Sequence, residues 1–365
     1  MLSPPGQSLS SLLHPLRKGI LKLGWASLVG VMVCACFILG ELSSTALAVP
    51  TAEEVLKALA ISNSDQEQIR KGEIVRWTTN EGSDRELAVG VALLVRDTPK
   101  NLAALFREAV TYRIVGSVTA YGEISGKGTV DDFAGAKLEP NGEDEAKRYL
   151  EVEPGDTLNL DAKEISAFQG LKTTDRVQPT VEALIREKLL ARYQAYRQSG
   201  LSGIPSYDRG GGETFQLGQD LLLATNQSTV LEKFCEKFYQ ILLTYPAVDT
   251  KPIEDWFYWV NVEVFSRPTL ILSHRMLFDH SGIFVTADRH FYASHEYNGL
   301  QSIAGTLPVK EGSLFLVLYR ISTDGVAGFG SSMKHPVARG LMGPYMEEMF
   351  EGIRAKIKNP SRRSQ

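Results

Sequence analysis

The chain has 365 residues, of which 43% are hydrophobic and 22% are charged, and these proportions are typical of a folded protein with a sizeable core. Its formal net charge of -4 argues against the basic face that nucleic-acid binding requires, so we expect no nucleic-acid partner. Of the three cysteines, only Cys235 lies beyond residue 48, which leaves no intramolecular disulfide for the body of the chain.

The N-terminal part has the pattern of an export signal. Residues 23–40, LGWASLVGVMVCACFILG, carry no charge and follow basic residues. They lead to Ala46 and Ala48, whose small-x-small spacing is typical of a cleavage site. Residues 1–48 are therefore predicted to be a signal peptide or, if uncleaved, a membrane anchor. We expect an exported protein, either periplasmic or anchored to the outer face of the cytoplasmic membrane through the apolar run.

Short helices and a hairpin are predicted next. Segments 51–60 and 63–72 have helical patterns, and Gly72 ends the second. Segments 73–79 and 86–95 are rich in β-branched residues and are joined by turn formers. This pattern predicts an antiparallel β-hairpin.

A helix should follow the hairpin directly, because Thr98 is a favourable N-cap and Pro99 suits the first helical position. Between 113 and 172 the signals are weaker, and Gly, Pro and acidic residues suggest frequent turns. Short strands are predicted in this region at 117–125, 148–153 and 158–168.

The middle of the chain is predicted to be largely helical. Segment 179–198 has an apolar stripe with charges elsewhere, which predicts an amphipathic helix. Segment 199–213 is rich in Gly and Ser and is predicted to be a loop. Further helices are expected at 214–225 and 228–245. Cys235 lies among apolar residues at helical spacing, so a buried structural thiol is predicted.

The last third should form a sheet and its cover. Segments 255–265, 268–278, 282–298 and 312–323 predict an antiparallel meander, and segment 337–358 predicts a long helix. The apolar stripe of this helix consists of Leu341, Met342, Tyr345, Met346, Met349, Phe350, Ile353 and Ile357. A sheet with one apolar face must be covered, so an α+β body follows.

The stretch RHFYASHEYN is the densest group of functional side chains. Strand alternation would place Asp288, His290 and Tyr292 on one face, with His295 on the other, which argues against a shared metal. We predict that these three residues line a ligand pocket, and we expect no metal site. A neighbouring strand is predicted to contribute polar and aromatic groups to this pocket, namely Trp259, Asn261 and Glu263.

No motif identifies a reaction. A nucleophile elbow, a phosphate-binding loop and a dinucleotide fingerprint are all absent from the sequence, so neither a cofactor nor a catalytic residue is predicted. Ser331 and Lys334 have the S-x-x-K spacing of penicillin-recognising enzymes, but the other elements of those enzymes are missing. His274 interrupts an apolar strand face and is interpreted as a hydrogen-bonded core residue.

The order of elements resembles the START-like (helix-grip, SRPBCC-type) superfamily. The resemblance covers residues 85–125, a strand followed by a Pro-initiated helix, and residues 250–358, late antiparallel strands followed by a Gly-rich turn and a long helix. In that superfamily a curved antiparallel sheet grips a long C-terminal helix and encloses a cavity for hydrophobic ligands.

The resemblance implies a START-like domain at 85–358 with a helical insertion at about 175–245. An N-terminal helical segment with the first strand would occupy 49–84, and 359–365 would be a disordered tail. We therefore expect an exported protein that binds a hydrophobic or lipid-like ligand between the sheet and the C-terminal helix. Two alternatives stay open: an envelope enzyme, hydrolase or cyclase-like, with the same pocket, and a structural envelope protein. The sequence does not decide whether the chain is an enzyme, because catalytic residues are often scattered.

Overall fold

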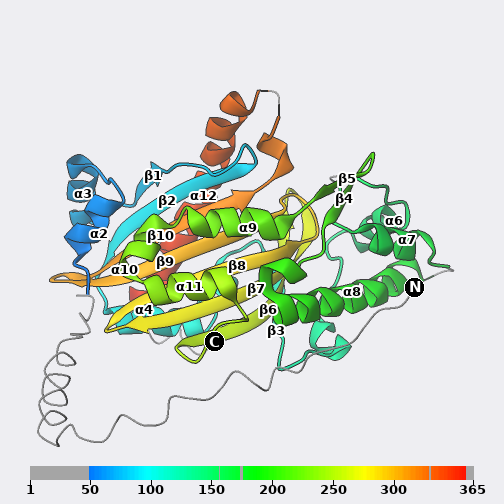
Figure 1. The fold of residues 1–365 in the computed structure, drawn as a ribbon, viewed down its shortest axis with the longest axis horizontal. Coiled ribbons are helices and arrows are strands. Elements are labelled where there is room, and N and C mark those ends of the chain that lie inside the picture. The colour runs from blue at the N-terminus through cyan, green and yellow to red at the C-terminus, as the bar shows by residue number, and fades with distance from the viewer. Residues whose placement is uncertain (1–48, 156, 173–175, 329, 359–365) are drawn as a thin grey trace, which may run out of the picture. The chain divides into compact units, whose positions relative to one another are not determined.

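The computed structural model describes residues 49–155, 157–172, 176–328 and 330–358, whose central element is an eight-stranded antiparallel sheet (Figure 1). Its strand order is β1-β2-β10-β9-β8-β7-β6-β3. The strands are β1 (Val75–Thr78), β2 (Glu86–Val95), β3 (Val118–Glu123), β6 (Ile253–Val264), β7 (Arg267–His280), β8 (Ile283–Ala293), β9 (Gly299–Val309) and β10 (Gly312–Ser322). A separate hairpin consists of β4 (Tyr207–Gly210) and β5 (Glu213–Phe215). The α+β class and the antiparallel sheet are thus as predicted.

One face of the sheet, called here the α12 face, is covered by α4 (Pro99–Arg107), α5 (Val110–Ile114) and α12 (Ser331–Lys358). Val91 and Leu93 of β2 point to this side, because alternate residues of a strand face the same way. They share a core cluster with Met346 and Phe350 of α12. The long C-terminal helix therefore packs on the sheet.

The opposite face, called here the α11 face, is covered by helices from two parts of the chain. Ala92, Leu314 and Leu316 point to this side. In Figure 1, α9 and α11 lie along it, in front of the sheet. The helices on this side are α2 (Ala52–Ala58), α3 (Asn63–Arg70), α6 (Gly142–Leu150), α7 (Ala162–Gln169), α8 (Val177–Ser199), α9 (Leu217–Asn226), α10 (Thr229–Phe234) and α11 (Glu236–Thr244). Helices α2 and α3 therefore pack in the same core cluster as α10, α11 and the sheet.

The local signals at the start of the chain are confirmed. Helices α2 and α3 occupy the predicted segments, and β1 pairs antiparallel with β2. The Thr98 side chain accepts a hydrogen bond from the Asn101 backbone N–H, and Pro99 is the first residue of α4. The N-cap and the proline identified in the sequence therefore mark the observed start of this helix.

Two predicted strands are wrong, because 148–150 is the end of α6 and 151–153 is not a strand, while most of 158–168 lies in α7. Asp161 caps α7 through a capping box with Glu164, a stronger local signal than the alternating pattern. The predicted loop 199–213 contains most of the β4–β5 hairpin, and the helix predicted at 228–245 is interrupted at Cys235.

Strand β9 was not predicted, because Gly299, Gly305 and Pro308 are weak strand formers. The strand forms because it lies between β8 and β10, whose backbones supply its hydrogen-bonding partners. Helix α12 also begins earlier than predicted, at Ser331. Leu341, which was assigned to its buried stripe, is 68% exposed.

None of the helices within the described residues is both long enough and apolar enough to cross a membrane. The predicted export signal or anchor at 1–48 and the predicted tail at 359–365 lie outside the described residues.

Candidate ligand cavity

A cavity of about 180 Å³ lies between the α12 face of the sheet and its covering helices. Its wall combines side chains of α4, α5 and α12 with those of six neighbouring strands, β3 and β6 to β10. Most of these side chains are apolar, including Leu105, Phe106, Val260, Phe315, Met349 and Ile353. A concave, mostly apolar space with a few polar groups is the usual form of a small-molecule site.

The polar part of the wall is a cluster of side chains around Asp288, at a point where β7 and β8 lie side by side. The Ser273 hydroxyl donates to Asp288 Oδ1 at 2.6 Å. The Tyr112 hydroxyl lies 3.1 Å from Ser273 Oγ and 3.5 Å from Asp288 Oδ2. Burial raises the pKa of Tyr112, so its hydroxyl stays protonated and can donate. The cluster thereby holds a carboxylate at the cavity wall.

Arg275 lies directly opposite Asp288 in the β7–β8 register and is only 1% exposed. Its guanidinium carbon lies 3.9 Å from the centroid of the Phe106 ring and 5.0 Å from that of Tyr112. The nearest carboxylate contact is between Arg275 Nε and Asp288 Oδ2 at 3.7 Å, which is too long for a hydrogen bond. Among the described residues, none accepts a hydrogen bond from any nitrogen of this guanidinium.

His290 is on the same face as Asp288 and also lines the cavity. Its Nδ1 is 2.8 Å from the Tyr297 hydroxyl, and its Nε2 is 3.7 Å from Asp288 Oδ1. Burial lowers the pKa of His290, although the nearby carboxylate opposes the shift. The imidazole is therefore neutral near pH 7 and can accept or donate one hydrogen bond.

Of the six predicted pocket residues, the structure brings Asp288 and His290 to the cavity. Tyr292 was expected on the same face, and this is wrong. A β-bulge at Phe291 makes Ser273 pair with His290 and Leu272 pair with Tyr292, which turns Tyr292 to the α11 face. There its ring lies 4.3 Å from the guanidinium carbon of Arg192.

The three residues predicted from β6 also lie elsewhere. Trp259 and Asn261 point to the α11 face, where the indole N–H donates to the Asp132 carbonyl and the Asn261 amide donates to the Lys137 carbonyl. Glu263 is exposed. The alternate residues of this strand, Val260 and Val262, line the cavity instead. The face of β6 depends on its register with β7, which the sequence pattern does not reveal.

Arg275 and Tyr112 were missed as cavity residues. One signal for Arg275 was available, because it is a charged residue within the apolar strand segment 268–278. Tyr112 lies in α5, a single short helix without a recognisable start signal.

His274, next to Arg275, points to the α11 face and is fully buried. Its Nδ1 is 3.0 Å from the Tyr196 hydroxyl, and its Nε2 is 3.1 Å from Asp255 Oδ2. The ring also stacks on Phe257, with centroids 4.1 Å apart. The interpretation of His274 as a hydrogen-bonded core residue is confirmed.

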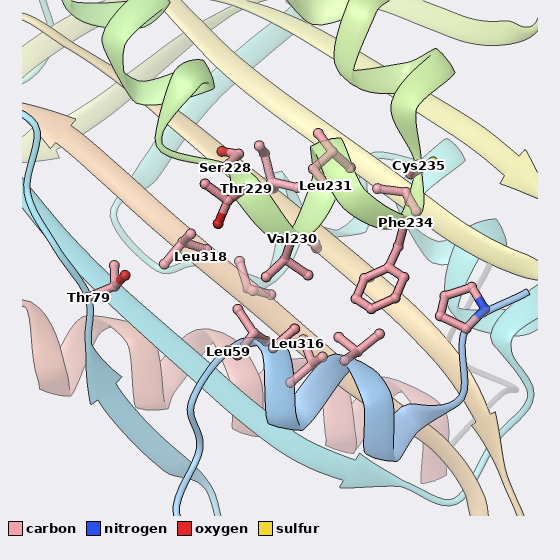
Figure 2. A pocket seen from close by; sticks show the side chains of 18 of the residues that line it. Leu59, Thr79, Ser228, Thr229, Val230, Leu231, Phe234, Cys235, Leu316 and Leu318 are labelled. Atoms are coloured by element: carbon pink, nitrogen blue, oxygen red, sulfur yellow. The ribbon is translucent and has the colours of Figure 1, made fainter. Parts of the chain in front are cut away.

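A second, larger cavity of about 400 Å³ lies on the α11 face, between α2, α10 and the sheet (Figure 2). Val230 and Phe234 of α10 and Leu59, the residue after α2, line it together with Leu316 and Leu318 of β10. No Lys, Arg, Asp or Glu belongs to its described lining. The buried thiol of Cys235 is part of the wall, and burial raises its pKa to about 12, so it is not a ready nucleophile.

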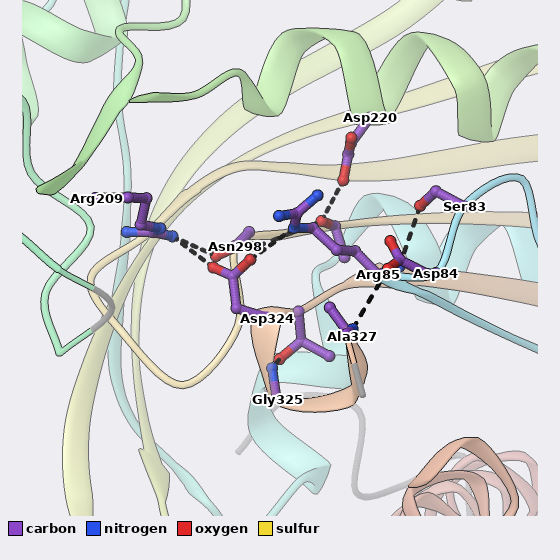
Figure 3. A network of polar contacts seen from close by, with 12 residues as sticks. Ser83, Asp84, Arg85, Arg209, Asp220, Asn298, Asp324, Gly325 and Ala327 are labelled. Atoms are coloured by element: carbon purple, nitrogen blue, oxygen red, sulfur yellow. Dashed lines mark hydrogen bonds and ion pairs between the residues drawn. The ribbon is translucent and has the colours of Figure 1, made fainter. Parts of the chain in front are cut away.

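A third group, the polar network around Asp324, joins the β4–β5 hairpin to the end of β10 (Figure 3). Arg85 Nε donates to Asp324 Oδ1 at 2.8 Å, and Arg209 Nη2 is 2.9 Å from Asp324 Oδ2. Arg209 also donates to the Asn298 side chain at 2.8 Å. Asp324 Oδ1 thus accepts a hydrogen bond, whereas Oδ2 is in an ion pair with Arg209 without accepting one, and we assign this network to structure.

No cluster of three or more His, Cys, Asp or Glu residues suited to a metal ion occurs in the described part of the chain. No protein-family model, no curated protein and no solved structure matches this sequence.

Proposed function

We propose that this protein binds a small hydrophobic molecule in the cavity between the sheet and α12. The observation that carries the proposal is the composition of the cavity wall, which is mostly apolar and includes Arg275, Asp288 and His290 from two neighbouring strands. The larger cavity on the α11 face has polar side chains in its wall, such as Asn80, Gln227 and His280, but no Lys, Arg, Asp or Glu among its described lining residues. Recognition of one ligand among many apolar molecules requires a few well-placed polar contacts.

The volume supports a small ligand. In another protein, an apolar cavity of roughly 150 Å³ holds one benzene molecule. A space of about 180 Å³ therefore suits one aromatic ring or a short branched chain with a small polar substituent. Of the hydrophobic or lipid-like molecules that the sequence led us to expect, we therefore propose a small one.

The arrangement of α12 on the antiparallel sheet supports a helix grip of the kind found in START-like proteins. We propose that α12, with α4 and α5, holds the cavity closed. Phe350 and Met346 attach α12 to β2, whereas Met349 and Ile353, one turn apart, lie at the cavity wall. The same helix would thus stabilise the sheet and complete the ligand site.

Ligand binding is tested by titrating the purified protein with ethylbenzene and measuring heat by calorimetry. We expect saturable binding at one site in the wild type and its loss in Ser302→Phe, because Ser302 lies opposite Asp288 at the cavity wall and the added ring fills the space. Thr229→Phe, which enlarges a residue at the larger cavity, is the matched control and should bind as the wild type does.

Thermal unfolding of each variant establishes that it is folded, and Ser302→Leu is the milder alternative if the ring overpacks the core. Absence of binding in the wild type would contradict the proposal. Binding abolished by Thr229→Phe, but kept in Ser302→Phe, would instead locate the ligand in the larger cavity.

We also propose that the protein acts outside the cytoplasm. Support comes from the basic start, the uncharged run at 23–40 and the Ala46-Leu47-Ala48 sequence. N-terminal sequencing of protein from a cell-envelope fraction should begin at Val49. A chain that keeps residue 1 or 2 in that fraction would indicate an uncleaved anchor, and an exclusively cytosolic chain would contradict export.

A further inference from the structure

Arg275 is part of the cavity wall, and its guanidinium is a buried cation whose three nitrogens have no hydrogen-bond acceptor in the described chain. The rings of Phe106 and Tyr112 lie close to it, and such cation–π contacts favour the charge. Ring contacts of this kind do not replace hydrogen-bond acceptors for the N–H groups along the guanidinium edge. A buried donor without an acceptor is costly, so these groups point to a missing partner within the cavity.

Charge balance decides what kind of partner fits. Asp288 Oδ2 lies 3.7 Å from Arg275 Nε, and at this distance it balances the positive charge without accepting a hydrogen bond. Among the described residues of the cavity wall there is no further full charge while His290 is neutral. A ligand carboxylate would therefore bring a second, uncompensated negative charge beside Asp288 in a buried site, which is unfavourable.

We propose that Arg275 donates hydrogen bonds to a carbonyl-type oxygen of an uncharged ligand, such as a ketone, an ester or an amide. The inference rests on the proposed function, because the ligand must occupy this cavity. A carbonyl oxygen has two lone pairs and can accept from both terminal nitrogens of the guanidinium. The site then satisfies the buried donors while the net charge of the cavity stays at zero.

Three probes of similar size separate the candidate chemistries: ethylbenzene has no acceptor, acetophenone has a neutral carbonyl, and benzoate has a carboxylate. Calorimetric titration at pH 7 should show acetophenone binding at least roughly tenfold more tightly than ethylbenzene, because a charged donor strengthens the bond. Benzoate should bind more weakly than acetophenone.

The Arg275→Met variant keeps an unbranched apolar chain in place of the aliphatic part of arginine and removes the guanidinium donors. In this variant the preference for acetophenone over ethylbenzene should disappear, while ethylbenzene binding persists. The matched control is Arg107→Met on α4. Arg107 pairs with Glu254 near the surface and does not line the cavity, so the preference should be kept.

The outcomes separate this inference from the function on which it rests. If folded wild-type protein binds none of the probes, the proposed function itself fails. Equal affinities for ethylbenzene and acetophenone would overturn the inference alone, as would benzoate binding most tightly. The wild-type comparison is decisive even if Arg275→Met does not fold. In that case Arg275→Lys, which keeps the charge but lacks the planar fork, should show a reduced preference.

Discussion

Phe350→Asp is expected to destabilise the protein by about 5 kcal/mol, the largest effect among the variants considered. The Phe350 side chain is fully buried in α12, and its ring centroid is 5.9 Å from that of Phe315 on β10. Removing a buried aromatic ring costs about 3–5 kcal/mol, and burying a carboxylate without a partner adds to this cost. Chemical denaturation followed by circular dichroism gives the free energy of unfolding.

Leu341→Asp is the matched control, because it introduces the same charge on the same helix at a side chain that is 68% exposed. It should change the free energy of unfolding by less than about 0.5 kcal/mol. If both variants had the same denaturation midpoint as the wild type, α12 would not be part of the cooperative core.

The second large effect expected is a loss of stability in mild acid caused by His274. Burial lowers the pKa of this histidine from 6.5 to about 4, although its hydrogen bond with Asp255 opposes the shift. As the pH falls below 6.5, the imidazole takes up a proton in the unfolded chain, whereas the folded protein keeps it neutral until about pH 4. The free energy of unfolding should therefore decrease across this window by about 3 kcal/mol.

The contribution is fully present above pH 6.5 and is lost as the pH falls through 4, which urea unfolding between pH 7.5 and 4 can measure. In His274→Gln the decrease should be smaller, because glutamine does not titrate. Burial lowers the pKa of His290 as well, so part of the decrease should persist. The charged and titratable neighbours of His274 stay in place, namely Tyr196, Arg197, Tyr245, Asp255 and Arg289. The same pH dependence in variant and wild type would show that His274 is not the titrating group.

Elements with strong local signals could be predicted from the sequence. Helix α4 has its cap and its proline within two adjacent residues, Thr98 and Pro99, and it begins where they predict. Strand β9 could not be predicted in this way, because it is held by neighbouring strands on both sides and not by its local composition. Helix α7 did have a local signal, the capping box of Asp161 and Glu164, which the alternating pattern of its segment outweighed in the prediction. The Glu164 carboxylate also pairs with the buried Arg192 of α8, and this tertiary contact is not visible in the sequence.

The candidate site shows the same division. Alternation within β8 predicted that Asp288 and His290 share a face, and both line the cavity. The alternation failed two residues later, because the bulge at Phe291 turns Tyr292 to the other side. The amino-acid composition of β8 gives no signal for a bulge at this phenylalanine.

The sequence by itself determined the α+β class, the antiparallel pairing of most late strands and the long C-terminal helix with its apolar stripe, because periodicity and caps act within a few residues of one another. Only the tertiary structure decided which side chains meet. Arg275 joins Asp288 through the β7–β8 register, and Tyr112 arrives from a helix more than 150 residues earlier in the chain. A shift of one residue in register exchanges the two faces of a strand, and the balance of distant contacts selects the register. The cavity and its buried cation are therefore properties of the assembled sheet.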